Sequence, residues 1–328
     1  MSKEMRWGIL GTGSIAKQFA RGLQAVPDAR LVAVGSRTGA TADAFGKDFN
    51  APKRHASYEA LAADPEVDAI YVSTPHPMHK DNTILCLKAG KAVLCEKPFA
   101  MNAREAEEML RVARDRKVFL MEAMWTRFIP IICRVREWLS QGAIGEVKML
   151  TGDFGFRAGF DPKSRLFDPK LGGGALLDVG IYVVSFASMV YGEQPARIAS
   201  MAHFCETGVD DNAAMILGYG RGQLAALSTS VCATTPHEVW ILGTEGKIKI
   251  HAPFWKATTA TLSRDGKGSE TIELPHTGNG YNYEAVEVGD CVRAGKLESA
   301  TMPLDESLAI MKTMDTIRAQ WGLKYPME

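Results

Sequence analysis

The chain has 328 residues, and its 38 Lys and Arg residues balance 38 Asp and Glu residues, so it carries no formal net charge. This balance disfavours nucleic acid or an anionic membrane as the main partner, because both would favour a basic excess. With 46% apolar residues the composition is that of a globular protein, and we expect no stretch that approaches the roughly 20 apolar residues of a membrane span. The length predicts two domains.

The first 17 residues contain a short apolar run and a glycine loop, without the features of a signal peptide, so we expect a cytoplasmic protein. The six cysteines include no C-x-x-C pair and are expected to be reduced. His76 and His79 lie three residues apart. No further ligand cluster accompanies them, and we expect no metal site.

Short apolar runs alternate with helical patterns over the first 121 residues. The predicted strands are Arg6–Leu10, Leu31–Gly35, Ala69–Val72, Ala92–Cys95 and Val118–Met121. The predicted helices are Ser14–Ala25, Ala40–Phe49, Met78–Ala89 and Ala103–Arg116. The apolar runs are continuous rather than alternating, which is typical of a parallel sheet covered on both faces. Residues 1–122 are therefore predicted to form an α/β domain with a doubly wound, Rossmann-type parallel sheet.

The pattern changes after a predicted helix at Phe128–Gln141. Strand-like stretches separated by glycine turns then dominate, at Val147–Phe156, Arg197–Glu206, Ala213–Tyr219, Gln223–Val231, Glu238–Leu242, Lys247–His251 and Thr258–Ser263. Predicted helices lie at Leu176–Tyr191, Tyr283–Ala294 and Ser307–Trp321. Residues 123–328 are predicted to form an α+β domain with a large, open, mostly antiparallel sheet.

A glycine-rich loop follows the first predicted strand and opens the first helix. It reads Gly11-Thr12-Gly13-Ser14-Ile15-Ala16, which has the form G-x-G-x-x-A. The glycines allow a tight turn and close approach of the backbone to a pyrophosphate, which the helix N-terminus stabilises. A structural turn without a ligand is the alternative. We predict that a dinucleotide binds here.

The end of the second predicted strand indicates which dinucleotide binds. An NAD site usually has Asp or Glu there, whereas this chain has Ser36, Arg37 and Thr38. A guanidinium and hydroxyls suit a 2′-phosphate, and no carboxylate repels it. We therefore favour NADP over NAD, although Arg37 could also be a solvated loop cation.

A charged pair lies at the end of another predicted parallel strand, where Glu96 and Lys97 precede Pro98. Ligands of open α/β sheets bind at this edge. Charged residues are also common there because the strand emerges into water, so the pair alone leaves both interpretations open.

The order of three motifs resembles the signature of the glucose–fructose oxidoreductase/inositol dehydrogenase (Gfo/Idh/MocA) family. The motifs are Gly11-x-Gly13-x-x-Ala16, Ser73-Thr74-Pro75-x-x-x-His79 and Ala89-Gly90-Lys91-x-Val93-x-x-Glu96-Lys97-Pro98. Residues 121–128 (MEAMWTRF), 144–146 (IGE) and 172–182 (GGGALLDVGIY) are most similar to its dimeric dihydrodiol dehydrogenase branch, which includes NADP-dependent trans-dihydrodiol and pentose dehydrogenases.

The resemblance implies a catalytic role for Lys97, near the substrate oxygen that gains or loses a proton. Asp178 and Tyr182 would complete the polar site, and on a helix their four-residue spacing gives them a common face. Many members of the wider family have His where this chain has Tyr182, so either Lys97 or Tyr182 could be the proton donor. A core Tyr bonded to a buried Asp is the structural alternative.

The resemblance implies further site residues with weaker support. Thr74, Pro75, His79, Glu96, Trp125 and Arg127 would line the cofactor site, although His79 could lie on a helix surface and Trp125 could pack between domains. Phe154, Phe156, Trp255 and Tyr281 could form an aromatic wall for the substrate, although such residues are more often core.

The sequence thus predicts an NADP-dependent oxidoreductase that transfers hydride to or from a sugar, polyol or cyclic diol. A non-catalytic dinucleotide sensor of the same fold is the alternative. The resemblance also implies a homodimer formed through the open sheet.

Overall fold

The structure is a computed structural model that describes residues 4–328, and it forms two compact units. The first joins the chain up to Phe128 with Thr277–Leu308, and the second joins Ile129–His276 with Ala309–Glu328. Residues 123–328 were predicted to form one domain, whereas Thr277–Leu308 packs with the first unit. The returning segment contains helix α8 (Asn282–Arg293), which packs against helix α1 (Ser14–Leu23). An amphipathic pattern indicates that a helix buries one face, but not which element covers it.

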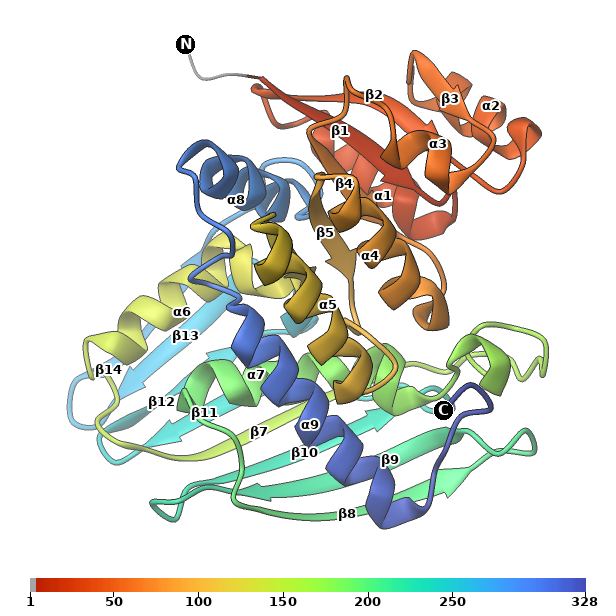
Figure 1. Ribbon diagram of the computed structural model, residues 1–328. Helices are drawn as coiled ribbons and strands as arrows, with labels where there is room; N and C mark the ends of the chain where they lie inside the picture. The colour runs from red at the N-terminus through yellow and green to blue at the C-terminus, as the bar shows by residue number, and fades with distance from the viewer. Residues whose placement is uncertain (1–3) are drawn as a thin grey trace. The chain divides into compact units, whose positions relative to one another are not determined.

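The first unit is built on a six-stranded parallel sheet in the order β3-β2-β1-β4-β5-β6 (Figure 1). Its strands are β1 (Met5–Leu10), β2 (Ala29–Gly35), β3 (Lys53–His55), β4 (Ala69–Val72), β5 (Ala92–Glu96) and β6 (Leu120–Ala123). Its other helices are α2 (Gly39–Asp48), α3 (Tyr58–Ala62), α4 (His79–Lys88) and α5 (Ala103–Arg116), with short turns η1 (His76–Met78) and η2 (Trp125–Phe128). The strand order is that of the Rossmann fold. The predicted parallel α/β sheet is confirmed.

Two short elements of this unit, β3 and α3, are absent from the sequence prediction. Strand β3 has the sequence Lys-Arg-His, which carries no apolar signal, and it is a strand because it pairs with β2 at the sheet edge. A charged edge strand of this kind discourages pairing with other chains.

The second unit is built on an eight-stranded sheet in the order β14-β13-β12-β11-β7-β10-β9-β8. Its strands are β7 (Val147–Gly155), β8 (Arg197–Phe204), β9 (Asp210–Gly218), β10 (Leu224–Ser230), β11 (Val239–Gly243), β12 (Gly246–Ile250), β13 (Thr259–Arg264) and β14 (Gly268–Glu273). All neighbouring strands are antiparallel except β7 and β10, so the predicted mostly antiparallel sheet is confirmed. Strand β14, which has few apolar residues, was not predicted.

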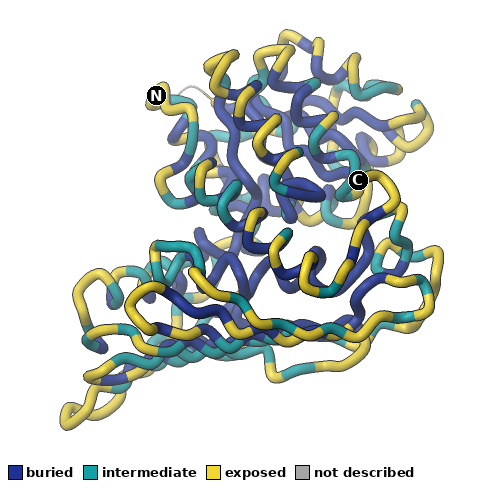
Figure 2. The backbone as a smooth tube through the Cα atoms, turned by 60° about the horizontal axis from the view of Figure 1, so that its bottom comes forward, coloured by how far each residue is buried: buried dark blue, intermediate teal, exposed yellow. Residues whose placement is uncertain are grey.

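Helices cover one face of this second sheet. They are α6 (Pro130–Ser140), α7 (Ile181–Tyr191) and the later part of α9 (Leu304–Trp321), and no helix of the described chain is drawn against the opposite face (Figure 1). Along β9 buried and exposed residues alternate, and exposed segments follow the strands of the sheet in Figure 2. One face of the sheet is therefore core and the other is surface.

The expectation that no apolar stretch reaches the length of a membrane span is wrong for one segment. The helical stretch Pro169–Tyr191 contains an 18-residue window with a mean hydropathy of 1.6. That window is 89% buried, and α7 packs on β7 and β10. A helix that is apolar all round is expected in the core of a large protein, as here.

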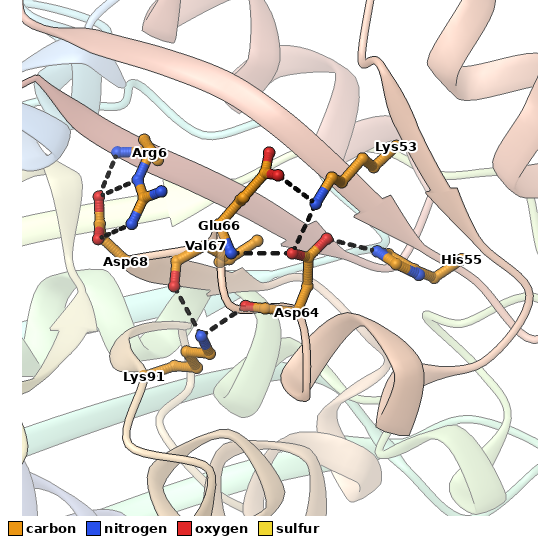
Figure 3. A network of polar contacts seen from close by, with 8 residues as sticks. All are labelled: Arg6, Lys53, His55, Asp64, Glu66, Val67, Asp68 and Lys91. Carbon is orange, nitrogen blue, oxygen red and sulfur yellow. Dashed lines mark hydrogen bonds and ion pairs between the residues drawn. The ribbon is translucent and has the colours of Figure 1, made fainter.

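A polar network joins the strands of the first unit around Asp64, whose side chain is 2% exposed (Figure 3). The Asp64 carboxylate lies 2.9 Å from both Lys53 Nζ and His55 Nε2, so it binds the edge strand β3. Lys91 Nζ donates to the backbone carbonyls of Asp64 and Val67, at 2.6 and 2.8 Å. Burial alone would raise the pKa of Asp64, but its hydrogen bonds with the Glu66 N–H, Lys53 and His55 lower that pKa to about 2.

We expect the substitution Asp64→Asn to lower the free energy of unfolding by about 2 kcal/mol at pH 7. Because the folded-state pKa is below the ordinary value, this stabilisation is fully present above pH 4 to 5 and is lost as the pH falls through about 2. Urea unfolding of the two proteins between pH 7 and pH 3 measures the difference. The exposed Asp43 is the matched control, since Asp43→Asn should change stability little at any pH. A pH-independent difference for Asp64→Asn would contradict this account.

Candidate functional site

The glycine loop between β1 and α1 has the form that a dinucleotide phosphate requires. Gly11 has a φ of +104°, and a Cβ at this residue would lie 2.9 Å from Ser73 Oγ, so only glycine fits. A Cβ on Gly13 would meet no atom within 4 Å, so this side of the loop is open. Gly13 also caps α1 without any side-chain hydrogen bond to the first-turn N–H groups. These amides can bind an anion, and the residues present therefore fit a pyrophosphate.

Hydroxyl groups gather at the end of β2. Ser36 Oγ lies 2.6 Å from Thr41 Oγ1 and 3.4 Å from Thr12 Oγ1, and the Thr38 hydroxyl caps α2 by accepting from the Thr41 N–H. Arg37, the residue after Ser36 along the chain, is exposed. This cluster offers donors without any carboxylate.

His79 is fully buried, so the alternative of a helix-surface residue is wrong. Its Nδ1 lies 2.8 Å from the carbonyl oxygen of Pro98, and its Nε2 lies 2.9 Å from that of Thr74. Burial lowers the pKa of His79 to about 4, so the ring is neutral at pH 7 and its single N–H donates to one of the two carbonyls. The histidine thus links the end of β4 to the segment that follows Lys97. Pro75 directly precedes the η1 turn.

Glu96, the last residue of β5, is buried and fixes the backbone of Lys97. The Tyr71 hydroxyl donates to Glu96 Oε1, and the Lys97 N–H donates to Glu96 Oε2 at 3.1 Å. Lys97 itself is half-buried. In the strand order the chain proceeds outward from β1 to β2 and from β4 to β5, in opposite directions, so the order reverses between β1 and β4. Ligands of such sheets bind at the carboxyl ends of the strands near this point, and Lys97 follows the neighbouring strand β5.

Trp125 and Arg127 lie in η2, at the same edge of the first unit. The Trp125 ring stacks on Tyr281, with centroids 4.4 Å apart. The buried Arg127 guanidinium bonds to Glu306 at 2.7 Å and to the Thr301 carbonyl at 3.3 Å. Arg127 therefore joins η2 to the returning segment.

Asp178 and Tyr182 lie in the second unit, in the helical segment that starts with the wide π-turn η4 (Leu176–Gly180) and continues as α7. Both are almost fully buried, at 4% and 7% exposure. The Asp178 carboxylate accepts two hydrogen bonds from Arg165, at 2.6 and 3.4 Å. Such π-turns are frequent at functional sites.

Three of the four predicted substrate-wall residues lie together in the second unit. Phe154 stacks on Trp255 with centroids 3.6 Å apart, and it also contacts Phe156 and Tyr182, at 6.5 and 5.2 Å. The fourth, Tyr281, lies in the first unit against Trp125. The aromatic wall of the second unit therefore adjoins Tyr182, whereas Lys97 and Tyr281 belong to the other unit.

Comparison with known proteins identifies the family. The model of the Gfo/Idh/MocA "Oxidoreductase family, NAD-binding Rossmann fold" matches residues 5–124, and the model of the family's C-terminal domain matches residues 132–249. The chain is also 40% identical to a trans-1,2-dihydrobenzene-1,2-diol dehydrogenase of Xenopus tropicalis, over 98% of this chain and 99% of that protein. The chain belongs to this oxidoreductase family.

Two further proteins are similar to this chain over nearly their full length. The trans-1,2-dihydrobenzene-1,2-diol dehydrogenase of Homo sapiens is 38% identical over 99% of both chains. A 3-ketoreductase from Actinomadura kijaniata, solved in complex with NADP and TDP-benzene, is 25% identical with a TM-score of 0.85 and covers 97% of this chain and 98% of its own.

Two buried acids of this family member were missed by the sequence analysis. Glu122, on β6, accepts from the Phe99 N–H at 3.2 Å, and burial raises its pKa to about 7. Glu284, on α8, is fully buried, and neither of its carboxylate oxygens has a partner among the described residues. Burial, and then the negative charge of Glu96, raise the pKa of Glu284 well above its usual value. Glu122 could have been found as an acid at a strand end, but no sequence signal distinguishes Glu284.

His237 was also missed, and it extends the aromatic wall. Its ring lies edge-on to Trp255 and Phe154, with centroid distances of 4.7 and 5.7 Å. Its backbone has a φ of +65°, which is unusual for a residue other than glycine, and its N–H donates to Asp153 Oδ2 at 2.6 Å. Strained backbone at such a position is often associated with function. Within residues 4–328 no cluster of three or more potential metal ligands is present.

Proposed function

We propose that this chain is an NADP-dependent dehydrogenase or reductase that acts on the CH–OH group of a sugar, polyol or cyclic diol. The observation that carries the proposal is the buried Glu96 that fixes Lys97 at the carboxyl edge of a Rossmann sheet. Full-length similarity to dihydrodiol dehydrogenases and an open glycine loop support it. The aromatic wall of Phe154 and Trp255 suits a flat or partly apolar ring.

The nicotinamide supplies or accepts the hydride when the cofactor is bound. In the oxidising direction the substrate hydroxyl loses its proton as the hydride leaves the adjacent carbon, and in the reducing direction a proton is added to the oxygen. In our proposal Lys97 and Tyr182 bind this oxygen and hold or move the proton, while Asp178 orients them. A cation near the oxygen stabilises the negative charge that develops there.

Lys97→Met should lower turnover by at least about 1,000-fold and leave the affinity for NADP nearly unchanged, because the substitution removes the proton-holding group but keeps an unbranched side chain of similar size. Initial rates with aldoses, inositols and trans-dihydrodiols measure turnover, and nucleotide fluorescence titration measures affinity. Lys88→Met, at an exposed residue in the last turn of α4, is the matched control and should retain full activity. Substantial residual turnover in Lys97→Met would refute the central role of this lysine.

The preference for NADP is proposed from Arg37 and the hydroxyl cluster of Thr12, Ser36 and Thr41. The NADP complex of the similar 3-ketoreductase supports the same choice. An acid that would bind the 2′-hydroxyl of NAD is absent from the Gly35–Thr38 segment.

Arg37→Ala should raise the dissociation constant for NADP by about 10- to 100-fold, since a charge-assisted hydrogen bond contributes about 1.5–3 kcal/mol. The affinity for NAD should change little. Arg30→Ala, which removes an exposed arginine elsewhere on β2, is the control. Equal losses for the two dinucleotides would argue against a 2′-phosphate contact.

We also propose a homodimer that forms through the open face of the second sheet. This face has a shallow cavity of about 500 Å³ lined by β8, β9 and β10, and Met201 and Ile216 are 81% and 46% exposed on it. Contiguous exposed apolar residues of this kind mark interaction surfaces. The proposal includes a cytoplasmic location, which stays a prediction from the sequence.

Ile216→Lys should convert the dimer to a monomer, because a charge in the centre of an apolar interface has no partner. Sedimentation velocity at micromolar concentration measures the state. Val286→Lys, at a residue that is 37% exposed on α8, should stay dimeric. A monomeric wild-type protein would contradict the proposal.

A further inference from the structure

The segment 173–176, which leads into the helix of Asp178 and Tyr182, is held by side chains from distant parts of the chain. The hydroxyl of Tyr325, which is 3% exposed, donates to the carbonyl oxygen of Gly173 at 2.6 Å. A carbonyl buried in this way needs a protein donor, because water cannot replace it without cost.

Two strands of the second sheet hold the next residues. Asp210 Oδ2, on β9, accepts from the Leu176 N–H at 2.7 Å, and the Thr229 hydroxyl, on β10, donates to the Ala175 carbonyl at 3.3 Å. Asp210 and Thr229 are both fully buried. A Cβ on Gly174, whose φ is +120°, would collide with the Asp210 carboxylate. The turn and the carboxylate are therefore in close contact, and no larger residue fits.

Tyr325, which follows α9, is itself held by contacts with Glu328 and with Arg318 of α9. Its N–H donates to Glu328 Oε2 at 2.9 Å, and its ring lies 5.2 Å from the Arg318 guanidinium. Arg318, which is 4% exposed, forms bonds of 2.8 and 2.9 Å with the Glu328 carboxylate and of 2.8 Å with Asp315. Bidentate charge-assisted bonds of this kind keep their geometry well.

Asp210 has one oxygen without a partner. Oδ2 binds Leu176, whereas Oδ1 has no hydrogen-bond partner within the described chain. Burial raises the pKa of this carboxyl to about 7, which is the direction expected when a carboxylate lacks compensating donors. Such a buried, incompletely paired group costs stability, and it lies beside the turn that leads into the helix of Asp178 and Tyr182.

We propose that Tyr325 and Asp210 are positioning residues that set the direction of Asp178 and Tyr182 through the glycine turn at 172–174. The inference rests on the proposed function of these two residues. The Asp178 N–H donates to the Gly174 carbonyl at 3.3 Å, so a movement of the turn reaches Asp178 directly. Successive residues of a helix point about 100° apart around its axis. A small shift in the residue at which the π-turn begins therefore changes the directions of both side chains.

Tyr325→Phe removes only the hydroxyl that binds Gly173 and tests the proposal. Tyr191→Phe is the matched control, because the Tyr191 hydroxyl donates to the Leu224 carbonyl at the same distance of 2.6 Å, in the same unit but away from the glycine turn. We expect Tyr325→Phe to lower kcat by roughly 10- to 100-fold with little change in NADP affinity. Tyr191→Phe should stay within twofold of the wild type.

Asp210 is tested by a conservative pair of variants. Asp210→Asn keeps an oxygen that can accept from the Leu176 N–H and should retain most of kcat. Asp210→Ala loses the acceptor and should lower kcat as Tyr325→Phe does. Equal kcat values for the Asn and Ala variants would overturn the role of this acceptor.

Hydrogen exchange of the amides at 176–182 gives a readout that does not depend on turnover. Tyr325→Phe should speed exchange in this segment but not in β11 or β12, whereas Tyr191→Phe should leave it unchanged. If the wild type turns over no substrate, the proposed function fails while the exchange still measures the positioning. If Tyr325→Phe changes neither kcat nor the exchange of residues 176–182, compared with Tyr191→Phe, the positioning role is refuted. A loss of thermal stability alone would not support it.

Discussion

The arrangement of this protein depends on one requirement, that buried backbone N–H and C=O groups find partners. At each functional segment the partner is a side chain, either from the same segment or from a distant part of the chain. His79 binds carbonyls at the ends of two strand segments, Glu96 accepts from the Lys97 N–H, and Tyr325 donates to Gly173. The irregular backbone at these places is held by such contacts, because no ladder or helix can satisfy it.

This requirement explains why the candidate site contains so many buried ionisable groups. Strand ends at the carboxyl edge of the first sheet leave free N–H groups, and the acids there accept from them. Glu96 accepts from the Lys97 N–H, and Glu122 accepts from the Phe99 N–H. Burial disfavours the charged form of a carboxyl, and it raises the pKa of Glu122 to about 7 although the positive charge of Arg127 and the Phe99 N–H act in the opposite direction. Glu122, whose pKa lies near neutrality and which binds the N–H two residues after Lys97, is for this reason a candidate functional group.

Much of the fold could be predicted because its long elements repeat one pattern. Strand β4 and helix α5 were predicted at their observed bounds, since continuous apolar runs and amphipathic periods do not depend on distant residues. Strands β3 and β14 could not be predicted, because their residues are polar and only pairing with a neighbour makes them strands. The glycine loop and the Glu96–Lys97 pair were found because order along the chain identifies them. Glu284, His237 and Tyr325 carry no local signal.

The sequence by itself determined the two kinds of sheet, the glycine loop, and which residue types stand at the ends of the parallel strands. These follow from local periodicity and from the chemistry of single residues, which do not depend on contacts with distant parts of the chain. Only the tertiary structure decided that Thr277–Leu308 returns to the first unit, that β7 and β10 pair in parallel, and that Tyr325 reaches the glycine turn. Such contacts join residues far apart in the chain, as Tyr325 and Gly173 are at 152 positions. Hydrophobic burial and hydrogen bonding require that a buried group has a partner, but they do not determine which residue it is.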